Sequence, residues 1–357
     1  MWQGREIVLC ALAVLAGNVL GDALLLSPVL YLVLSLVFAG AACWRPVVSG
    51  WPVWSLLALA MLGAAAVQVG RMPACTAPPA LSAWAAGVKD SFSAWLGRLL
   101  PEGDELAVLR ALSIGDRSGL TRDLRFAYRD SGAMHLLALS GLHVGLVYAL
   151  LSFLLRSLGG FRAARLLRSF VVLGLLWTYA LVTGLSASIS RAVLMITFYE
   201  ISGLLSGDRD GLSALAGSAL LLMILRPESP RDIGFQLSYI AVLSILLLHP
   251  WFSGLLQTRS RLLRRVWELL SVSLCCQATC GVLAWLYFGT FPRYFLLTTL
   301  FAIPLTTAAM YTIAAAVASA ALSSILPVLA PVATWTAETL RWLLHLLNTL
   351  LHLIASL

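Results

Sequence analysis

The sequence has little charge and almost no lysine. Charged residues make up 11% of its 357 residues, whereas soluble globular domains carry about 25%. Lys89 is the single lysine, so these residues contain no Gly-x-x-x-x-Gly-Lys-Ser/Thr phosphate-binding loop. The composition therefore excludes an ordinary soluble protein, and the missing lysine excludes an ATP-driven motor within this sequence.

Histidine and cysteine are scarce as well, with five and six residues. No His-x-His pair of the kind that opens a two-metal hydrolase site is present. The stretch CCQATC, residues 275–280, lacks a second ligand pair and a polar loop, and cysteine in an apolar run usually packs as a small hydrophobe. We therefore expect no metal and no other cofactor.

What the sequence has in abundance is apolar residues, which make up 60% of the chain. Many apolar runs are long enough to cross a hydrocarbon core of about 30 Å. They predict an all-α fold, a polytopic transmembrane helix bundle of about eleven spans, of which the shorter ones are expected to be half-helices. The expected spans are 7–24, 27–43, 51–70, 133–155, 168–185, 188–206, 211–226, 233–251, 266–289, 294–320 and 326–355.

Two arginine-rich segments predict the orientation of the bundle, because short cytoplasmic loops are enriched in Lys and Arg. An even number of predicted spans separates the two segments, so both can be cytoplasmic. This scheme places the N-terminus in the cytoplasm and the C-terminus outside. The arginines concerned are Arg162, Arg165 and Arg168 in the first segment and Arg259, Arg261, Arg264 and Arg265 in the second.

Residues 73–131 differ from the rest, since they mix charges with apolar residues at helical spacing. The pattern predicts amphipathic helices lying along the outer membrane surface, although a helical hairpin packed on the bundle would look the same. The sequence thus divides into N-terminal spans (1–72), amphipathic helices (73–131) and a membrane domain (132–357). The apolar stripe comprises Leu81, Trp84, Val88, Phe92, Trp95, Leu96 and Leu99.

The stretch HLLALSGLHVGLV, residues 135–147, places polar groups inside an apolar run. On a continuous helix the rings of His135 and His143 would lie about 80° apart. Gly141 and Gly145 would let another helix come close or let the helix break. Such polar groups indicate either a tightly packed helix or a functional site. Ser140 and His143 could also form a nucleophile and base, although neighbours at this spacing point in nearly parallel directions.

Three further polar clusters fall within apolar runs. Ser188 and Arg191 occur in TGLSASISR, and Gln236 and Ser238 occur in GFQLS. Glu200 stands in the middle of a predicted span and needs a partner or a proton, and Arg191 is too far along the helix to supply one directly. We expect these side chains to face the inside of the bundle or a wet cavity.

Four segments resemble the ComEC competence family in the order in which that family carries them. The resemblance covers roughly residues 100–310 and implies a bacterial inner-membrane channel or permease that conducts single-stranded DNA into the cytoplasm during natural transformation, with a periplasmic C-terminus and no catalytic residues. The segments are GAMHLLALSGLHVGLV (132–147), TGLSASISRAVLMI (183–196), PRDIGFQLSYIAVLSIL (230–246) and CCQATCGVLAWLYFGTFPRYFLLTTLFAIPL (275–305).

The resemblance also implies partners and a path. We expect single-stranded DNA and the lipid bilayer as partners, with a separate cytosolic helicase-like motor, a periplasmic DNA receptor and a possible second copy of the chain. The two arginine-rich segments would receive the strand. The candidate path residues are His135, Ser140, Gly141, His143, Ser188, Arg191, Gln236 and Ser238.

The sequence departs from the family in three ways. Residues 73–100 are too few for the OB-like domain of full-length members, and the metallo-β-lactamase-like domain is missing, so we expect the core translocation domain alone. Thr299 stands where the family has asparagine. Three alternatives stay open: a small-solute transporter, an intramembrane serine hydrolase that uses Ser140 and His143, and a relic that has lost transport.

Overall fold

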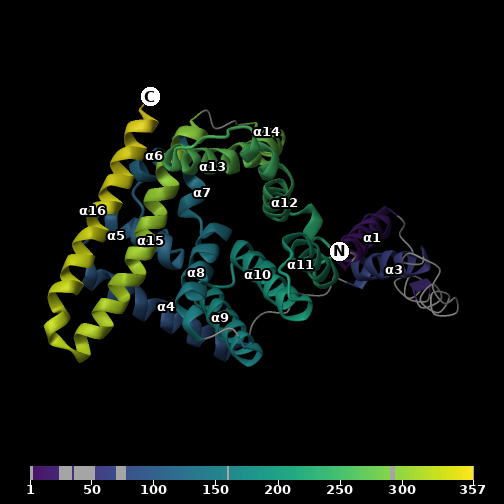
Figure 1. Ribbon diagram of the computed structural model, residues 1–357, viewed down its shortest axis with the longest axis horizontal. Helices are drawn as coiled ribbons and strands as arrows, with labels where there is room; N and C mark the ends of the chain where they lie inside the picture. The colour runs from purple at the N-terminus through teal and green to yellow at the C-terminus, as the bar shows by residue number, and fades with distance from the viewer. Residues whose placement is uncertain are drawn as a thin grey trace. The chain divides into compact units, whose positions relative to one another are not determined.

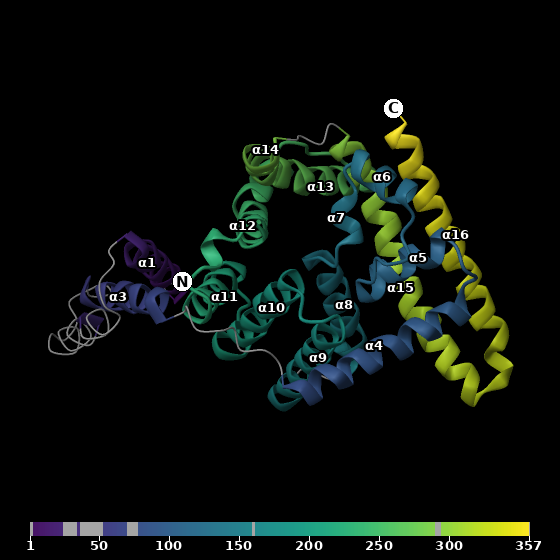
Figure 2. The same ribbon diagram turned by 180° about the vertical axis from the view of Figure 1, so that it is seen from behind.

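Every regular element that the structure, a computed structural model, describes is a helix, which confirms the predicted all-α fold. Figures 1 and 2 show it from opposite sides. The helices form two compact units: unit 1 comprises Met1–Ala77 and Leu194–Leu246, and unit 2 comprises Pro78–Val193 and Leu247–Leu357. The three domains expected from sequence stay a prediction. The described residues are 3–23, 34–35, 53–69, 78–158, 161–289 and 294–356.

Five of the described helices are long and apolar enough to cross a membrane, so the chain is a polytopic helical membrane protein. They are Ala163–Val182, Ala187–Leu205, Ile233–Gly254, Arg261–Phe288 and Phe295–Ile325. The count of eleven spans is not confirmed. The expected span 27–43 lies outside the described residues apart from residues 34 and 35, and the expected span 133–155 is two helices rather than one.

Unit 1 is built on helix pairs joined through glycines. An added Cβ on Gly63 would lie 2.6 Å from the Val14 carbonyl oxygen, and one on Gly17 would collide with the Ala60 carbonyl. Because glycine has no side chain, α1 and α3 lie backbone against backbone (Figure 1). The unit contains α1 (Gln3–Ala23), α3 (Val53–Val69), α11 (Gly211–Leu225), the end of α10 (Ala187–Ser206) and the start of α12 (Ile233–Gly254).

Unit 2 contains the amphipathic segment and most of the remaining helices. Its longest elements, α15 and α16, lie side by side in both views (Figures 1 and 2). The main elements of the unit, these two included, are α4 (Pro79–Leu99), α5 (Asp104–Ile114), α6 (Arg122–Asp130), α7 (Met134–Leu137), α8 (Gly141–Leu154), α9 (Arg162–Val182), α13 (Arg261–Cys276), a π-helical turn (Gln277–Gly281), α14 (Val282–Phe288), α15 (Phe295–Ile325) and α16 (Ala330–Ala355).

The core of unit 2 joins the amphipathic segment to the α15–α16 pair. Leucines and alanines of α5, α6 and α7 form one apolar cluster with buried residues of α15 and α16. Polar bonds fix the same contact: the buried Tyr128 hydroxyl donates to Asn348 Oδ1 at 2.9 Å, and the Thr298 hydroxyl donates to the Ser131 carbonyl. Because buried polar groups need such partners, these bonds set where α6 ends against the two long helices.

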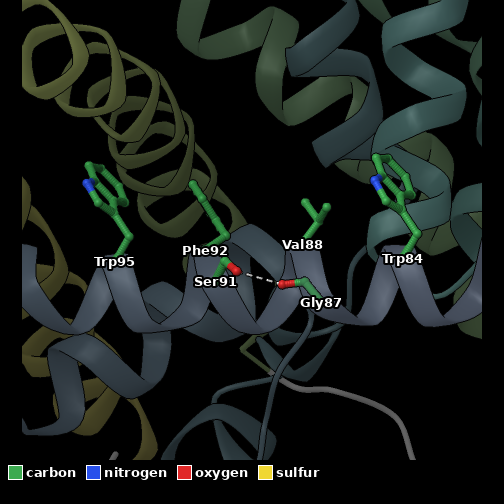
Figure 3. A pocket seen from close by; sticks show the side chains of 6 residues that line it. All are labelled: Trp84, Gly87, Val88, Ser91, Phe92 and Trp95. Carbon is green, nitrogen blue, oxygen red and sulfur yellow. Dashed lines mark hydrogen bonds between the residues drawn. The ribbon is translucent and has the colours of Figure 1, made fainter.

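The apolar stripe of α4 is divided between two environments. Leu96 is fully buried, and Phe92 and Trp95 pack against the core of unit 2. Trp84 and Val88 lie in the N-terminal part of the stripe and are exposed on the same side of the helix (Figure 3). The C-terminal half of α4 is therefore packed against unit 2. An open apolar pocket runs along the helix and is lined by Trp84, Gly87, Val88, Ser91, Phe92 and Trp95.

An ion pair ties α5 to α16 at the surface. His345 Nδ1 lies 2.9 Å from Glu105 Oε1. The hydrogen bond from His345 holds the pKa of the Glu105 carboxyl below its ordinary value of 4.5. A carboxyl with a lowered pKa stabilises the folded state above its ordinary pKa, and this stabilisation disappears as the pH falls through the lowered value.

Replacing Glu105 by Gln should therefore lower the unfolding temperature near neutral pH. The difference from the parent protein should shrink as the pH falls through the lowered pKa of Glu105, because the protonated carboxyl and the glutamine amide are both uncharged. Thermal unfolding in detergent across this pH range checks it, with Glu102→Gln, an exposed glutamate, as the matched control. A difference that stays constant with pH would contradict the role of this carboxylate.

Candidate functional site

The polar stretch 135–147 is not one helix, because the chain leaves the helical conformation at residues 138–140, here called the elbow. Ala138 has φ −84° and ψ 126°, and Ser140 has φ −122° and ψ 172°. Ser140 is the N-cap of α8, the position that serine favours, and its carbonyl accepts from His143 N–H at 3.1 Å. The expected 80° angle between the two histidines is therefore wrong, because it assumed an unbroken helix.

His143 closes the elbow from the α8 side. The Ser140 backbone N–H donates to His143 Nδ1 at 3.3 Å, and Ser140 Oγ lies 3.1 Å from the same nitrogen. Because a backbone N–H can only donate, Nδ1 is the acceptor, and a neutral ring carries its proton on Nε2. The ring is fully buried, and Nε2 has no hydrogen-bond partner among the described residues.

Residues of the α5–α6 loop hold the elbow from the other side. Arg117 Nε donates to the Leu137 carbonyl at 3.1 Å, which satisfies one of the free carbonyls at the end of α7. Gly115 (φ +74°) leaves room for Leu139, since an added Cβ there would lie 2.6 Å from Leu139 Cδ1. Sequence reasoning missed both residues, and only the Asp-Arg-Ser turn after Gly115 marks the place.

His135 and the two glycines have different surroundings. His135 is exposed, its Nδ1 donates to the Gly132 carbonyl at 3.0 Å, and its ring lies 5.9 Å from that of Phe295. Gly141 faces α10, where an added Cβ would be 3.7 Å from Ala192 Cβ, whereas one on Gly145 would have no described atom within 4 Å. A Cβ on Gly141 would make only an ordinary van der Waals contact, so the close helix approach expected from the glycine pair is not observed at either residue.

The segment before α10 forms a tight helix end that positions Arg191. Gly184 (φ +82°) and Leu185 (φ +48°) take left-handed conformations, and Leu185 N–H donates back to the Ala180 carbonyl at 2.7 Å. This bond closes α9 in a Schellman motif and starts α10 immediately. Ser188 is half-buried and Arg191 is buried; Arg191 directly precedes Ala192, which lies opposite Gly141. Ser140, His143, Ser188 and Arg191 all belong to unit 2.

Gln236 and Ser238 belong to unit 1, so the structure does not group them with the elbow. Gln236 Nε2 donates to the Pro230 carbonyl at 2.8 Å, which fixes the turn that precedes α12. Ser238 is half-buried on α12. The Gln236 bond supports a structural role at the start of α12, and the place of both residues on a path stays a prediction.

The partner of Glu200 is Arg209. The Arg209 guanidinium lies 2.9 Å from both carboxylate oxygens of Glu200 and 5.7 Å from the Tyr199 ring. Gly203 leaves the space for it, since an added Cβ would come within 2.6 Å of Arg209 Cγ. The sequence-based search looked only at Arg191 and missed the arginine in the turn GDRDG, which folds back over the end of α10.

The arginine-rich segments are mostly the first turns of helices rather than loops. Arg165 and Arg168 lie on α9, and Arg261, Arg264 and Arg265 lie on α13, whose N-cap Ser260 accepts from Leu263 N–H. Arg162 begins α9, and Arg259 precedes α13. Cations are unfavourable at helix N-termini because of the helix dipole, so these arginines serve something other than helix stability.

No group of three or more His, Cys, Asp or Glu among the described residues could hold a metal ion. Ser140 and His143 do approach to 3.1 Å, so the argument that they point in nearly parallel directions was wrong. The reason is that Ser140 is a cap outside the helix, and the same His143 nitrogen also accepts the Ser140 N–H.

These features define a polytopic helical membrane protein with a polar break in its interior. The family described as Competence protein matches residues 112–357, which is more than half of the chain. The chain belongs to the competence protein family, as the four segments predicted.

Individual relatives agree with this assignment over part of the chain. ComE operon protein 3 of Bacillus subtilis (strain 168) is 34% identical over 149 residues, which are 42% of this chain and 19% of the relative. Competence protein ComA of Neisseria gonorrhoeae is 32% identical over 145 residues, 38% of this chain and 20% of the relative. The chain thus spans about a fifth of each. No solved structure matches it.

Removing the Arg209 side chain should destabilise unit 1. Breaking a buried ion pair costs about 3–5 kcal/mol, and because Arg209 is one-third exposed we expect about 2–3 kcal/mol for Arg209→Ala. Chemical unfolding in detergent measures this. The control is Arg264→Ala, which breaks an exposed pair with Glu268 and should cost at most about 0.5 kcal/mol. Equal losses in the two variants would contradict the buried pairing.

Proposed function

We propose that this chain is the membrane part of an inner-membrane channel or permease that conducts single-stranded DNA into the cytoplasm during transformation. The observation that carries the proposal is the family match over residues 112–357, which contains the elbow and the buried Arg191. The names of two relatives, ComE operon protein 3 and Competence protein ComA, agree with a role in competence.

The chemistry of the substrate fits the polar groups of unit 2. A single strand carries one negative charge per nucleotide, and charge moves through a low-dielectric core only along a wet, polar path. Buried Arg191 and His143, with half-buried Ser140 and Ser188, supply polar groups at helices α8 and α10. Most of the arginines that begin α9 and α13 are exposed and suit binding of strand phosphates.

The proposal extends to partners. No phosphate-binding lysine loop occurs in the sequence, so we assign the driving force to a separate cytosolic helicase-like motor or to a gradient. A periplasmic DNA receptor delivers the strand, and a second copy of the chain is a candidate partner. The N-terminus is cytoplasmic and the C-terminus periplasmic in this scheme, because it places the arginine-rich starts of α9 and α13 in the cytoplasm.

The exposed half of the α4 stripe fits the lipid headgroup region. Trp84 is 50% exposed and Val88 36% exposed, and Lys89 lies on another face of the same helix. Tryptophan favours the membrane interface because its ring is apolar and its N–H is polar. In the proposed arrangement α4 lies along the membrane with its C-terminal half held by unit 2.

The test is uptake of labelled DNA into the cytoplasm of cells that lack this gene. The cells are complemented with the parent chain, His143→Ala, Arg191→Ala or the control His352→Ala, which changes an exposed histidine of α16. We expect the parent and the control to restore uptake and the other two to stay at the level of the deletion, at equal amounts in the membrane.

Undiminished uptake in the uncomplemented deletion would remove DNA transport as the function. Labelling of Ser140 by a fluorophosphonate in the same membranes would instead favour the hydrolase, for which the 3.1 Å approach of Ser140 Oγ to His143 is the one supporting observation.

A further inference from the structure

Six side chains of unit 2 carry a buried polar atom with no hydrogen-bond partner among the described residues. Three of these atoms belong to α8 and α15: His143 Nε2, Thr299 Oγ1 and Thr306 Oγ1. His143 and Thr306 are fully buried, and Thr299 is 3% exposed. Leaving such a group without a partner costs about 1–3 kcal/mol, and native proteins keep few of them. Three of them on two helices that contact each other point to a ligand that forms hydrogen bonds.

The two threonines occupy one face of α15. They are seven residues apart, so they lie within about 20° of one another around the helix and about 10 Å apart along it. Pro304, between them, has no N–H, so the Leu300 carbonyl cannot accept the usual bond from four residues on. Neighbouring Thr298 behaves differently, because its hydroxyl bonds the Ser131 carbonyl. Two turns of α15 thus carry inward polar groups.

Helix α8, which carries His143, packs against the core of unit 2 that contains α15. Helices α8 and α15 are in contact, and Leu142 and Leu146 of α8 pack against the cluster that contains Ala302 and Ala309 of α15. Because the elbow holds His143 Nδ1 as an acceptor, Nε2 of the neutral ring presents a donor. A threonine hydroxyl can both donate and accept. Water can accept a hydrogen bond from His143 Nε2 and can both donate to and accept from the threonine hydroxyls, so it suits all three groups.

We propose that His143, Thr299 and Thr306 bind water at the contact of α8 with α15, and that this seam is a wet stretch of the strand path. The second half of the statement rests on the proposed function, whereas the first half does not. The seam adds two residues of α15 to the site, at helix positions that the earlier candidates did not include.

Accessibility to a water-borne reagent tests the seam. Thr299→Cys and Thr306→Cys are compared with Ala316→Cys, a fully buried position further along the buried face of α15, in the full chain in membranes. A small charged methanethiosulfonate reacts with the thiolate, which needs water to form, so the two seam cysteines should react on the order of tenfold faster than the control. Peptide mass spectrometry separates them from the natural cysteines.

Reaction at 299 and 306 as slow as at 316 would overturn the seam. The path is tested separately with Thr299→Val/Thr306→Val, which keeps the shape and removes both hydroxyls, against Thr299→Ser/Thr306→Ser, which keeps them. We expect lost DNA uptake in the valine variant and retained uptake in the serine variant, at equal thermal stability. Equal uptake in both would overturn the path. If deletion of the gene leaves uptake intact, the proposed function fails while the thiol result still decides the seam.

Discussion

The arrangement of unit 2 depends on one capping interaction, in which the Ser140 backbone N–H and hydroxyl both meet His143 Nδ1. An N-cap serine stabilises a helix start by about 1 kcal/mol, and here it also ends the apolar run that would otherwise continue as one helix. Arg117 and Gly115 hold the other side of the elbow. With Nδ1 occupied, the buried ring presents Nε2 toward the core.

Much of the fold follows from the sequence. Apolar runs predicted the helices, and four short segments predicted the family. A helix break was predicted only as one alternative, at Gly141 and Gly145, and the elbow was not located, because only Ser140 with His143 three residues later marks a cap. The Glu200–Arg209 pair was also not predicted from the sequence, because it depends on a turn that folds back over α10. Local patterns describe helices well, whereas side-chain partners depend on tertiary contacts.

The candidate site was predicted in part for the same reason. The polar residues inside apolar runs were identified correctly as unusual, but the structure gives Gln236 an ordinary bond to the Pro230 carbonyl and leaves His135 exposed. It also adds Thr299 and Thr306, whose hydroxyls are unexceptional in a sequence and notable only once buried. Buried polar side chains of unit 2 thus occur on α8, on α15 and near the start of α10.

The protonation of the His143 ring tests the central claim most directly. Nitrogen-15 NMR of the protein labelled at histidine, with His143→Gln to assign the signal, would be recorded at about pH 8, above the ordinary imidazole pKa. The account predicts an unprotonated, hydrogen-bonded Nδ1 and a protonated Nε2 for His143. A proton on Nδ1 would contradict it, because the Ser140 N–H could then not donate to that nitrogen and the elbow would lack its cap.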